Sequence, residues 1–373
     1  MIDPKTVELF NSSIFDTFQT AKRLVSKSAL LPTAVKFLIY QRSAEQIREK
    51  WRRNGLQVPP LIIYSVTKRC NLRCVGCYHH AQHRANLDLT TERVRTLLDE
   101  AKELGVSIMV LAGGEPLMRK ELINLASEYP KMLFPIFTNG LLIDESSVYT
   151  FMENRNLVPM ISLEGPKEYT DNRRGDGVYK QVIHRFDSLD QSGIFFGTSI
   201  TVTRNNLETV TDDTFIKELC DHGVKVVVYV EYVPVEPGTE NLVLTESLRE
   251  KLMYRIEELR GRNLALFISF PGDEEKLGGC LAAGRGFIHI SQDGSVEPCP
   301  ASPFSDTNIK EVSLKEALSS KFLEKIRNDP QSLEHSESAC ALFDKEKWVK
   351  SLLTTYPTST LISSQDLNIN TAY

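Results

Sequence analysis

Residues 61–78 read LIIYSVTKRCNLRCVGCY, an apolar run that leads directly into a loop with three cysteines. The first seven residues are rich in β-branched side chains and predict a buried strand. Cys70, Cys74 and Cys77 follow with the spacing Cys-x3-Cys-x2-Cys. Thiolates suit iron-sulfur clusters, and three on one short loop can hold three irons of a 4Fe-4S cluster, which leaves the fourth iron open. An open iron can bind and reduce a small molecule, so the spacing indicates catalysis.

Apolar, β-rich runs then alternate with helical patterns along the chain. The patterns predict strands over 61–67, 107–111, 133–138, 158–163, 195–202 and 225–230, and helices over 90–104, 120–129, 145–152, 178–191 and 212–222. Such alternation predicts a parallel sheet whose site is built from the loops at the carboxyl ends of the strands. The character of the chain changes after Val235, before two more units could close an eight-stranded barrel. We therefore predict an α/β fold, a partial (β/α)6 TIM-like barrel.

Three more motifs follow predicted strands and belong to the same end of the sheet. They are Gly113-Gly114-Glu115-Pro116, Thr138-Asn139-Gly140, and a segment that begins Ser162-Leu163-Glu164-Gly165 and ends near Arg174. With these motifs in this order, and with the aromatic Tyr78 after the third cysteine, residues 60–235 resemble the radical S-adenosylmethionine (SAM) superfamily. The family's usual Asp is replaced here by Glu at position 164.

The resemblance implies that a 4Fe-4S cluster on Cys70, Cys74 and Cys77 binds SAM and cleaves it to a 5′-deoxyadenosyl radical, which takes hydrogen from a substrate. Glu115 would pair with the SAM ammonium, and Arg174 with its carboxylate. The full set of expected cofactor-binding residues is Tyr78, Gly113, Gly114, Glu115, Pro116, Thr138, Asn139, Ser162, Glu164 and Arg174.

Simpler interpretations of these residues stay open at this point. A zinc site could recruit His79 and His80. The Gly-Gly-Glu-Pro motif could be an ordinary turn between strand and helix. Glu164 and Arg174 could form a surface ion pair. An iron-sulfur electron carrier that does not cleave SAM is the alternative function.

A second cysteine set, Cys280, Cys299 and Cys340, surrounds a predicted hairpin whose turn lies at 292–295. This layout resembles the SPASM or twitch extension of radical SAM enzymes and implies an auxiliary 4Fe-4S cluster in a small C-terminal α+β domain. A dense downstream cysteine run is absent, so no further cluster is expected. The fourth iron could stay open, or its ligand could be His335, Asp344 or the substrate, whereas Cys220 fits core packing. Three unrelated thiols, or zinc, are the alternatives.

The remaining composition is that of an ordinary soluble protein. Its formal net charge of -5 gives no overall basicity for nucleic acid, and no apolar run is long enough for a membrane span. Seven cysteines in a large chain favour a reducing cytoplasm over a disulfide scaffold. Residues 1–58 carry ten basic and five acidic side chains. We expect them to form a helical cap, with peripheral membrane contact as the alternative.

Four segments are expected: a basic helical extension at 1–58, the barrel at 59–235, the auxiliary-cluster domain at 236–350 and a tail at 351–373. The resemblance favours a peptide or protein side chain as substrate, with a lipid or isoprenoid second and a tetrapyrrole third. A reductant such as flavodoxin or ferredoxin is the expected partner.

Overall fold

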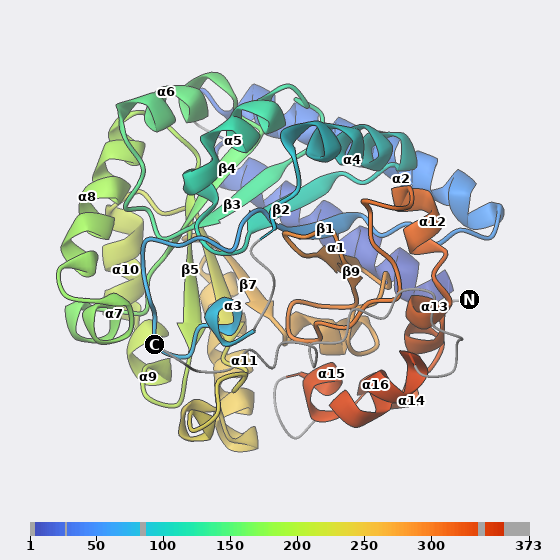
Figure 1. Ribbon diagram of the computed structural model, residues 1–373. Coiled ribbons are helices and arrows are strands. Elements are labelled where there is room, and N and C mark those ends of the chain that lie inside the picture. Colours follow the sequence, from blue (N-terminus) through green and yellow to red (C-terminus); the bar gives the residue numbers. More distant parts are fainter. Residues whose placement is uncertain (1–3, 27, 83–86, 335–339, 354–373) are drawn as a thin grey trace, which may run out of the picture.

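The computed structural model describes residues 4–26, 28–82, 87–334 and 340–353. The predicted tail from residue 354 onward, and His335, lie outside these residues. Nine strands form one sheet in the order β7-β6-β5-β4-β3-β2-β1-β8-β9, which curls into a partial barrel (Figure 1). The strands are β1 Leu61–Ser65, β2 Ile108–Ala112, β3 Phe134–Thr138, β4 Leu157–Ser162, β5 Gly197–Val202, β6 Val226–Glu231, β7 Leu266–Phe270, β8 Phe287–Ile290 and β9 Val296–Glu297.

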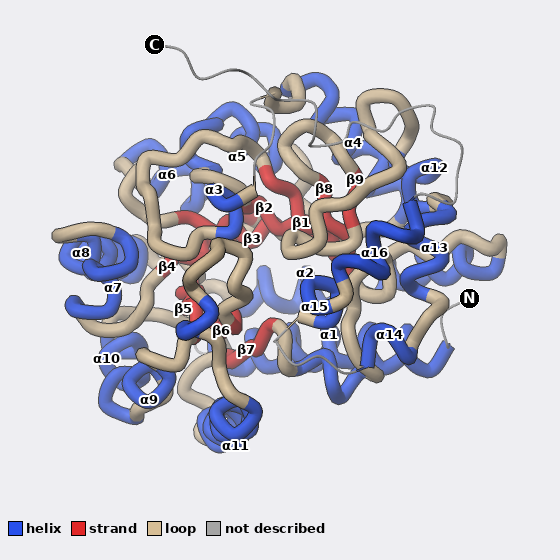
Figure 2. Tube along the Cα trace, turned by 60° about the horizontal axis from the view of Figure 1, so that its bottom comes forward, coloured by secondary structure: helices blue, strands red, loops and turns tan. Residues whose placement is uncertain are grey.

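All five predicted helices and all six predicted strands are present, so the predicted partial barrel is confirmed. The helices along the outside of the sheet are α4 Thr91–Leu104, α5 Lys120–Ser127, α6 Glu145–Glu153, α8 Val178–Gln191, α10 Asp213–Asp221 and α11 Glu246–Gly261 (Figure 2). Local chemistry sets their ends. Thr90 caps α4 by accepting a hydrogen bond from the backbone of Arg93, and Gly105 ends it in the left-handed conformation, at φ 86°.

Shorter elements connect these layers. On the loops after the parallel strands they are α3 Tyr78–Ala81, the 3-10 turn η1 Pro116–Arg119, α7 Lys167–Arg174, α9 Leu207–Val210 and the 3-10 turns η2 Glu240–Leu242 and η3 Asp273–Leu277. The C-terminal part adds α12 Leu314–Leu318, α13 Lys321–Arg327, α14 Gln331–Glu334, α15 Ala341–Asp344 and α16 Glu346–Leu353.

The sheet extends beyond the six predicted strands at both edges. β7 pairs with β6 in parallel, and β8 pairs with β1 in parallel, so that Tyr64 lies beside Ile290. The predicted hairpin is confirmed as the antiparallel pair β8 and β9. The boundary expected at residue 235 therefore falls between β6 and β7, two neighbouring strands of one sheet.

A buried chain of hydrogen bonds joins this hairpin to the barrel. Ser65 Oγ lies 2.8 Å from His289 Nε2, and His289 Nδ1 lies 2.7 Å from Glu297 Oε2. All three side chains are almost completely buried. Their mutual hydrogen bonding offsets the cost of removing polar groups from water and holds β8 and β9 beside β1.

The predicted N-terminal helical extension is confirmed as the helices α1 Pro4–Leu24 and α2 Leu31–Arg53. α1 packs against α2, β7 and η3, and a side chain added at Gly286 would strike Phe10. α1 thus lies where β7 and β8 approach each other, near the rings of Phe270 and Phe287, whose centroids are 5.3 Å apart. Among the described helices, none is long and apolar enough to cross a membrane.

Candidate functional site

Backbone hydrogen bonds tie the first cysteine loop to the Gly-Gly-Glu-Pro turn. The backbone N–H of Gly114 donates to the Thr67 carbonyl at 2.8 Å, and that of Glu115 donates to the Arg69 carbonyl at 2.9 Å. A Cβ at Gly114 would lie 2.1 Å from the Arg69 oxygen. Glycine is therefore required for the close approach of two loops, in addition to any approach of a ligand.

The cysteine loop is also anchored to elements far along the chain. A Cβ at Gly76, at φ 67°, would lie 2.4 Å from the Tyr232 hydroxyl, and the Gly76 N–H donates to Glu236 Oε2 at 2.8 Å. The Val75 N–H donates to the Arg173 carbonyl at 3.0 Å. Tyr232, Glu236 and Arg173 were not predicted as site residues, and their contacts with this loop join segments that lie far apart in the chain.

The two cysteine sets line one cavity of about 2030 Å³ on the concave side of the sheet. Its inner wall is largely apolar and includes Val158, Met160, Val226 and Val228, a group of buried side chains separate from the main core. The predicted site residues that line the cavity are Cys70, Cys74, Cys77, Tyr78, Gly113, Gly114, Asn139, Ser162, Arg174, Cys280, Cys299 and Cys340. Four others, Glu115, Pro116, Thr138 and Glu164, lie behind this lining.

Glu115 is completely buried and connects the loops after β2 and β3. Its carboxylate accepts hydrogen bonds from the Thr138 hydroxyl at 2.7 Å, from the Asn139 backbone N–H at 2.8 Å and from the Leu117 backbone N–H at 3.0 Å. Burial raises the pKa of Glu115, and these hydrogen bonds oppose that effect. Asn139 in turn donates from Nδ2 to Asn71 Oδ1 at 2.8 Å, inside the cysteine loop.

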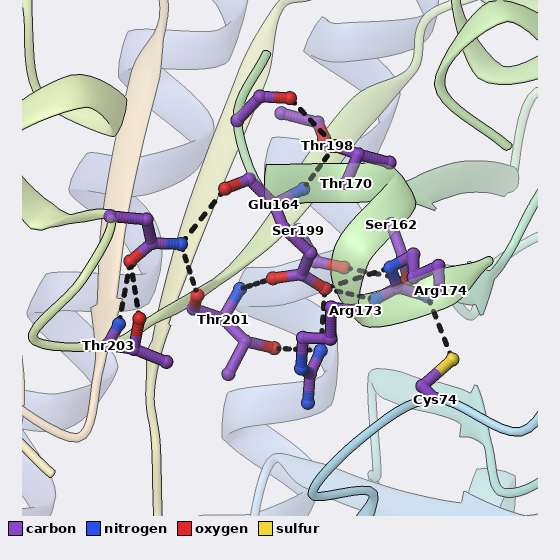
Figure 3. Close-up of polar contacts among 12 residues, drawn as sticks. Cys74, Ser162, Glu164, Thr170, Arg173, Arg174, Thr198, Ser199, Thr201 and Thr203 are labelled. Carbon is purple, nitrogen blue, oxygen red and sulfur yellow. Dashed lines mark hydrogen bonds and ion pairs between the residues drawn. The ribbon is translucent and has the colours of Figure 1, made fainter. Parts of the chain in front are cut away.

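Glu164 forms a buried ion pair with two arginines of α7 (Figure 3). Glu164 Oε1 accepts from Arg174 Nη2 at 2.5 Å and Nε at 2.8 Å, and from Arg173 Nη1 at 2.6 Å. The Glu164 side chain is only 2% exposed. The ion pair therefore exists, but the alternative interpretation that it lies on the surface is wrong, because the pair is buried. The third nitrogen of Arg174, Nη1, lies 4.0 Å from Cys74 Sγ.

Burial and the two arginines both shift pKa values in the first cysteine set. Burial raises the pKa of Cys70 to about 11. Burial also raises the pKa of Cys74, while the charges of Arg174 and Arg173 act in the opposite direction. Metal binding requires thiolates, and an iron ion favours deprotonation by its own charge. Two cations beside Cys74 favour the same ionised form.

The second cysteine set comes together from three separate segments. The Cys299 and Cys340 thiols lie within hydrogen-bonding reach of each other, and this contact holds the pKa of Cys340 below the ordinary value and that of Cys299 above it. Cys280 is close enough to act electrostatically on Cys299, and burial raises its own pKa. Glu274, which was not predicted, lies beside Cys280, and burial raises its pKa to about 7.

The ligands of both cysteine sets suit an iron-sulfur cluster rather than a single metal ion. Among the described residues, no three His, Cys, Asp or Glu side chains are close enough to share one metal ion. A 4Fe-4S cluster differs from a single ion because it binds each cysteine through a different iron, and three thiols lining one cavity provide the soft ligand set that it needs. His80 Nε2 lies 3.0 Å from the Leu72 carbonyl, so this side chain already has a hydrogen-bonding partner on the cysteine loop.

Two other candidate ligands do not line the cavity. Asp344 is exposed in α15, and its backbone N–H donates to the Cys340 carbonyl at 3.1 Å. Cys220 lies in α10, outside the cavity, and packs against the core with its sulfur 4.0 Å from the Leu264 carbonyl. These positions leave Cys280, Cys299 and Cys340 as the cysteines of this part of the cavity.

Comparison with known proteins agrees with this arrangement. The family model described as the Radical SAM superfamily matches residues 64–219. The chain is 35% identical to a probable GTP 3′,8-cyclase of Archaeoglobus fulgidus, over 63% of this chain and 83% of that protein. The chain belongs to the radical SAM superfamily and is an enzyme of that class.

Other relatives match at lower identity. The chain is 29% identical to an AdoMet-dependent heme synthase of Oleidesulfovibrio alaskensis, over 69% of this chain and 73% of the relative. It is 25% identical to a PqqA peptide cyclase of Granulibacter bethesdensis, over 65% and 68%. The alignment with the Fe-coproporphyrin III synthase of Methanosarcina barkeri, 29% identical, spans less than half of each protein, 46% of this chain and 44% of the other.

A solved structure shares the fold. The crystal structure of Streptococcus suis SuiB bound to precursor peptide SuiA superposes with a TM-score of 0.63, at 18% identity, over 84% of this chain and 74% of that one. At this identity the likeness concerns the fold alone.

Proposed function

We propose that Cys70, Cys74 and Cys77 hold a 4Fe-4S cluster at which this enzyme cleaves SAM reductively, so that hydrogen is abstracted from a substrate in the adjoining cavity. One observation carries the proposal: the loops after β1, β2, β3 and β4 converge on one cavity that all three thiols line. When bound, the cluster would supply the electron and the open iron. The protein would bind and orient SAM and exclude water.

Each loop has a distinct task in this proposal. Gly113 and Gly114 would offer backbone groups to SAM, because they line the cavity without side chains. Since Glu164 occupies Nε and Nη2 of Arg174, this arginine would reach the SAM carboxylate through Nη1. Arg173, which lines the same cavity, would be the second cation. Glu115 would act as a positioning residue that holds Asn139.

SAM cleavage is tested by anaerobic reconstitution with iron and sulfide, followed by dithionite and SAM. We expect release of 5′-deoxyadenosine and methionine. A cluster that is reduced by dithionite while SAM stays intact would instead identify an electron carrier and overturn the proposal.

We further propose that Cys280, Cys299 and Cys340 hold an auxiliary 4Fe-4S cluster within residues 236–350, and that this cluster exchanges electrons with the substrate radical or anchors the substrate. The support is that all three thiols line the cavity that the first set lines, although they come from the η3–β8 loop, the end of β9 and the start of α15. A flavodoxin or ferredoxin would deliver the electrons. Membrane contact through residues 1–58 stays a secondary proposal.

A peptide side chain is the proposed substrate, supported by the similarity to a PqqA peptide cyclase. A tetrapyrrole is the second candidate. The similarity to a heme synthase supports it, and so does the apolar inner wall of the cavity, which could accept a large apolar ring. An apolar lipid or isoprenoid would fit the same wall.

The substrate is tested by adding Fe-coproporphyrin III, or short peptides encoded by neighbouring genes, to the reduced enzyme with SAM. A true substrate should increase 5′-deoxyadenosine formation above the uncoupled rate and should itself change in mass. A tetrapyrrole that gives both signals, while the peptides give neither, would replace the peptide proposal.

A further inference from the structure

Glu274 is a buried carboxylate with an unused oxygen beside the second cysteine set. It lies in η3, the 3-10 turn that follows β7, and its residue is 8% exposed. Its Oε1 atom has no hydrogen-bond partner in the part of the chain that the structure describes. An unpaired buried carboxylate oxygen is costly, so it calls for a partner that the described residues do not supply.

The surroundings of Glu274 point to that partner. Its carboxylate lies within hydrogen-bonding reach of the Cys280 thiol and of the Leu281 backbone N–H, and its charge also acts on Cys340. It lines the cavity together with Cys280, Cys299 and Cys340. Three thiolates leave one iron of a 4Fe-4S cluster without a protein ligand.

The neighbouring acids of the same turn behave differently. Asp273 accepts hydrogen bonds from Arg260 Nη2 at 2.6 and 2.8 Å, and from the Ser269 N–H at 2.9 Å. Glu275 is exposed. All three acids line the cavity, but of these three only Glu274 is buried, and its carboxylate lies beside the Cys280 thiol.

Backbone contacts hold Glu274 and Cys280 in one short loop. The Gly279 N–H donates to the Glu274 carbonyl at 3.0 Å. Arg285 donates to the Cys280 carbonyl at 2.8 Å and to the Gly278 carbonyl at 2.9 Å. These contacts hold Glu274 and Cys280, six positions apart, in place before any metal binds. Metal binding would therefore require little reorganisation of the loop.

We infer that Glu274 is the fourth protein ligand of the auxiliary cluster, binding through its carboxylate the iron that Cys280, Cys299 and Cys340 leave open. The inference rests on the auxiliary cluster proposed above. Coordination is by the ionised carboxylate and involves no change of oxidation state. It would make the auxiliary cluster closed at rest, and therefore suited to carrying electrons rather than to anchoring the substrate.

The test uses the full chain with Cys70, Cys74 and Cys77 replaced by Ala, so that only the auxiliary cluster contributes signals. Iron content and the electron paramagnetic resonance spectrum of the reduced protein are measured with and without cyanide, a small ligand for an open iron. With Glu274 intact we expect about four irons per chain and a spectrum that cyanide leaves unchanged.

Adding Glu274→Ala or Glu274→Gln should open one iron. Cyanide should then shift the spectrum, and mild oxidation should produce a three-iron signal. Glu275→Gln is the matched control, an exposed acid of the same turn, and should behave like its parent. Circular dichroism shows whether each variant is folded, and the isosteric Gln variant preserves the packing if Ala does not.

Two results would overturn the inference and are distinguishable. A cyanide-sensitive spectrum with Glu274 intact would mean that the iron is open, while the auxiliary cluster itself would stand. Loss of all iron when Cys70, Cys74 and Cys77 are replaced would mean that there is no auxiliary cluster, so that both proposals fail.

Discussion

Glu164 and Arg174 form a two-point ion pair at the end of β4, with Glu164 Oε1 accepting from Nη2 at 2.5 Å and from Nε at 2.8 Å. The same carboxylate accepts from the backbone N–H of Thr201 through Oε2, at 3.0 Å. It therefore links the fourth strand, α7 and the fifth strand directly beside the first cysteine loop.

Glu164→Ala should lower the free energy of unfolding by about 3–5 kcal/mol, because it leaves two largely buried arginines without their carboxylate. Chemical denaturation of the metal-free protein measures this loss. Glu168→Ala, which removes an exposed acid of the same helix α7, is the control and should change stability by less than about 0.5 kcal/mol. Equal stabilities of the two variants would show that the ion pair contributes little.

Gly114→Ala should disrupt the cysteine loop, because its Cβ would lie 2.1 Å from the Arg69 carbonyl oxygen. We expect lower stability, together with loss of iron from the first set and of SAM cleavage. Gly261→Ala is the contrasting variant, since nothing lies within 4 Å of its Cβ at the end of α11. That change should be neutral or stabilise the protein by up to about 1 kcal/mol. Wild-type iron binding by Gly114→Ala would contradict the role given to the contact.

Replacing any one of Cys70, Cys74 and Cys77 by Ala should abolish SAM cleavage, because two thiolates cannot hold the cluster with one iron open. Formation of 5′-deoxyadenosine by the reconstituted protein is the measurement. Cys220→Ala, a thiol outside the cavity, should retain both iron and cleavage. Retained turnover in any of the first three variants would refute the assignment of the first cysteine set.

Replacing Cys280, Cys299 and Cys340 together by Ala should reduce the iron content from about eight to about four per chain, since each cluster carries four irons. The variant should still cleave SAM slowly, because the first cysteine set is unchanged, but it should form no product from the true substrate. An unchanged iron content would show that these thiols hold no cluster.

The amino-acid sequence by itself established the parts whose signals are local. Strand and helix periodicity predicted the βα units between residues 61 and 230, and the spacing of Cys70, Cys74 and Cys77 pointed to the cofactor. The hairpin was predicted from its turn at 292–295. Each of these signals lies within a few turns of helix or a single loop, where neighbouring side chains alone determine the pattern.

Tertiary packing determined how those parts meet. The parallel pairing of β8 with β1, the support of Gly76 by Tyr232 and the hydrogen bond from the Thr201 N–H to Glu164 all join positions far apart in the chain. The same holds for Glu274, an acid among several in its turn until folding brings it close enough to act on Cys340, far along the chain. Hydrogen bonds and close contacts of this kind depend on distances in space, and sequence separation carries no information about those distances.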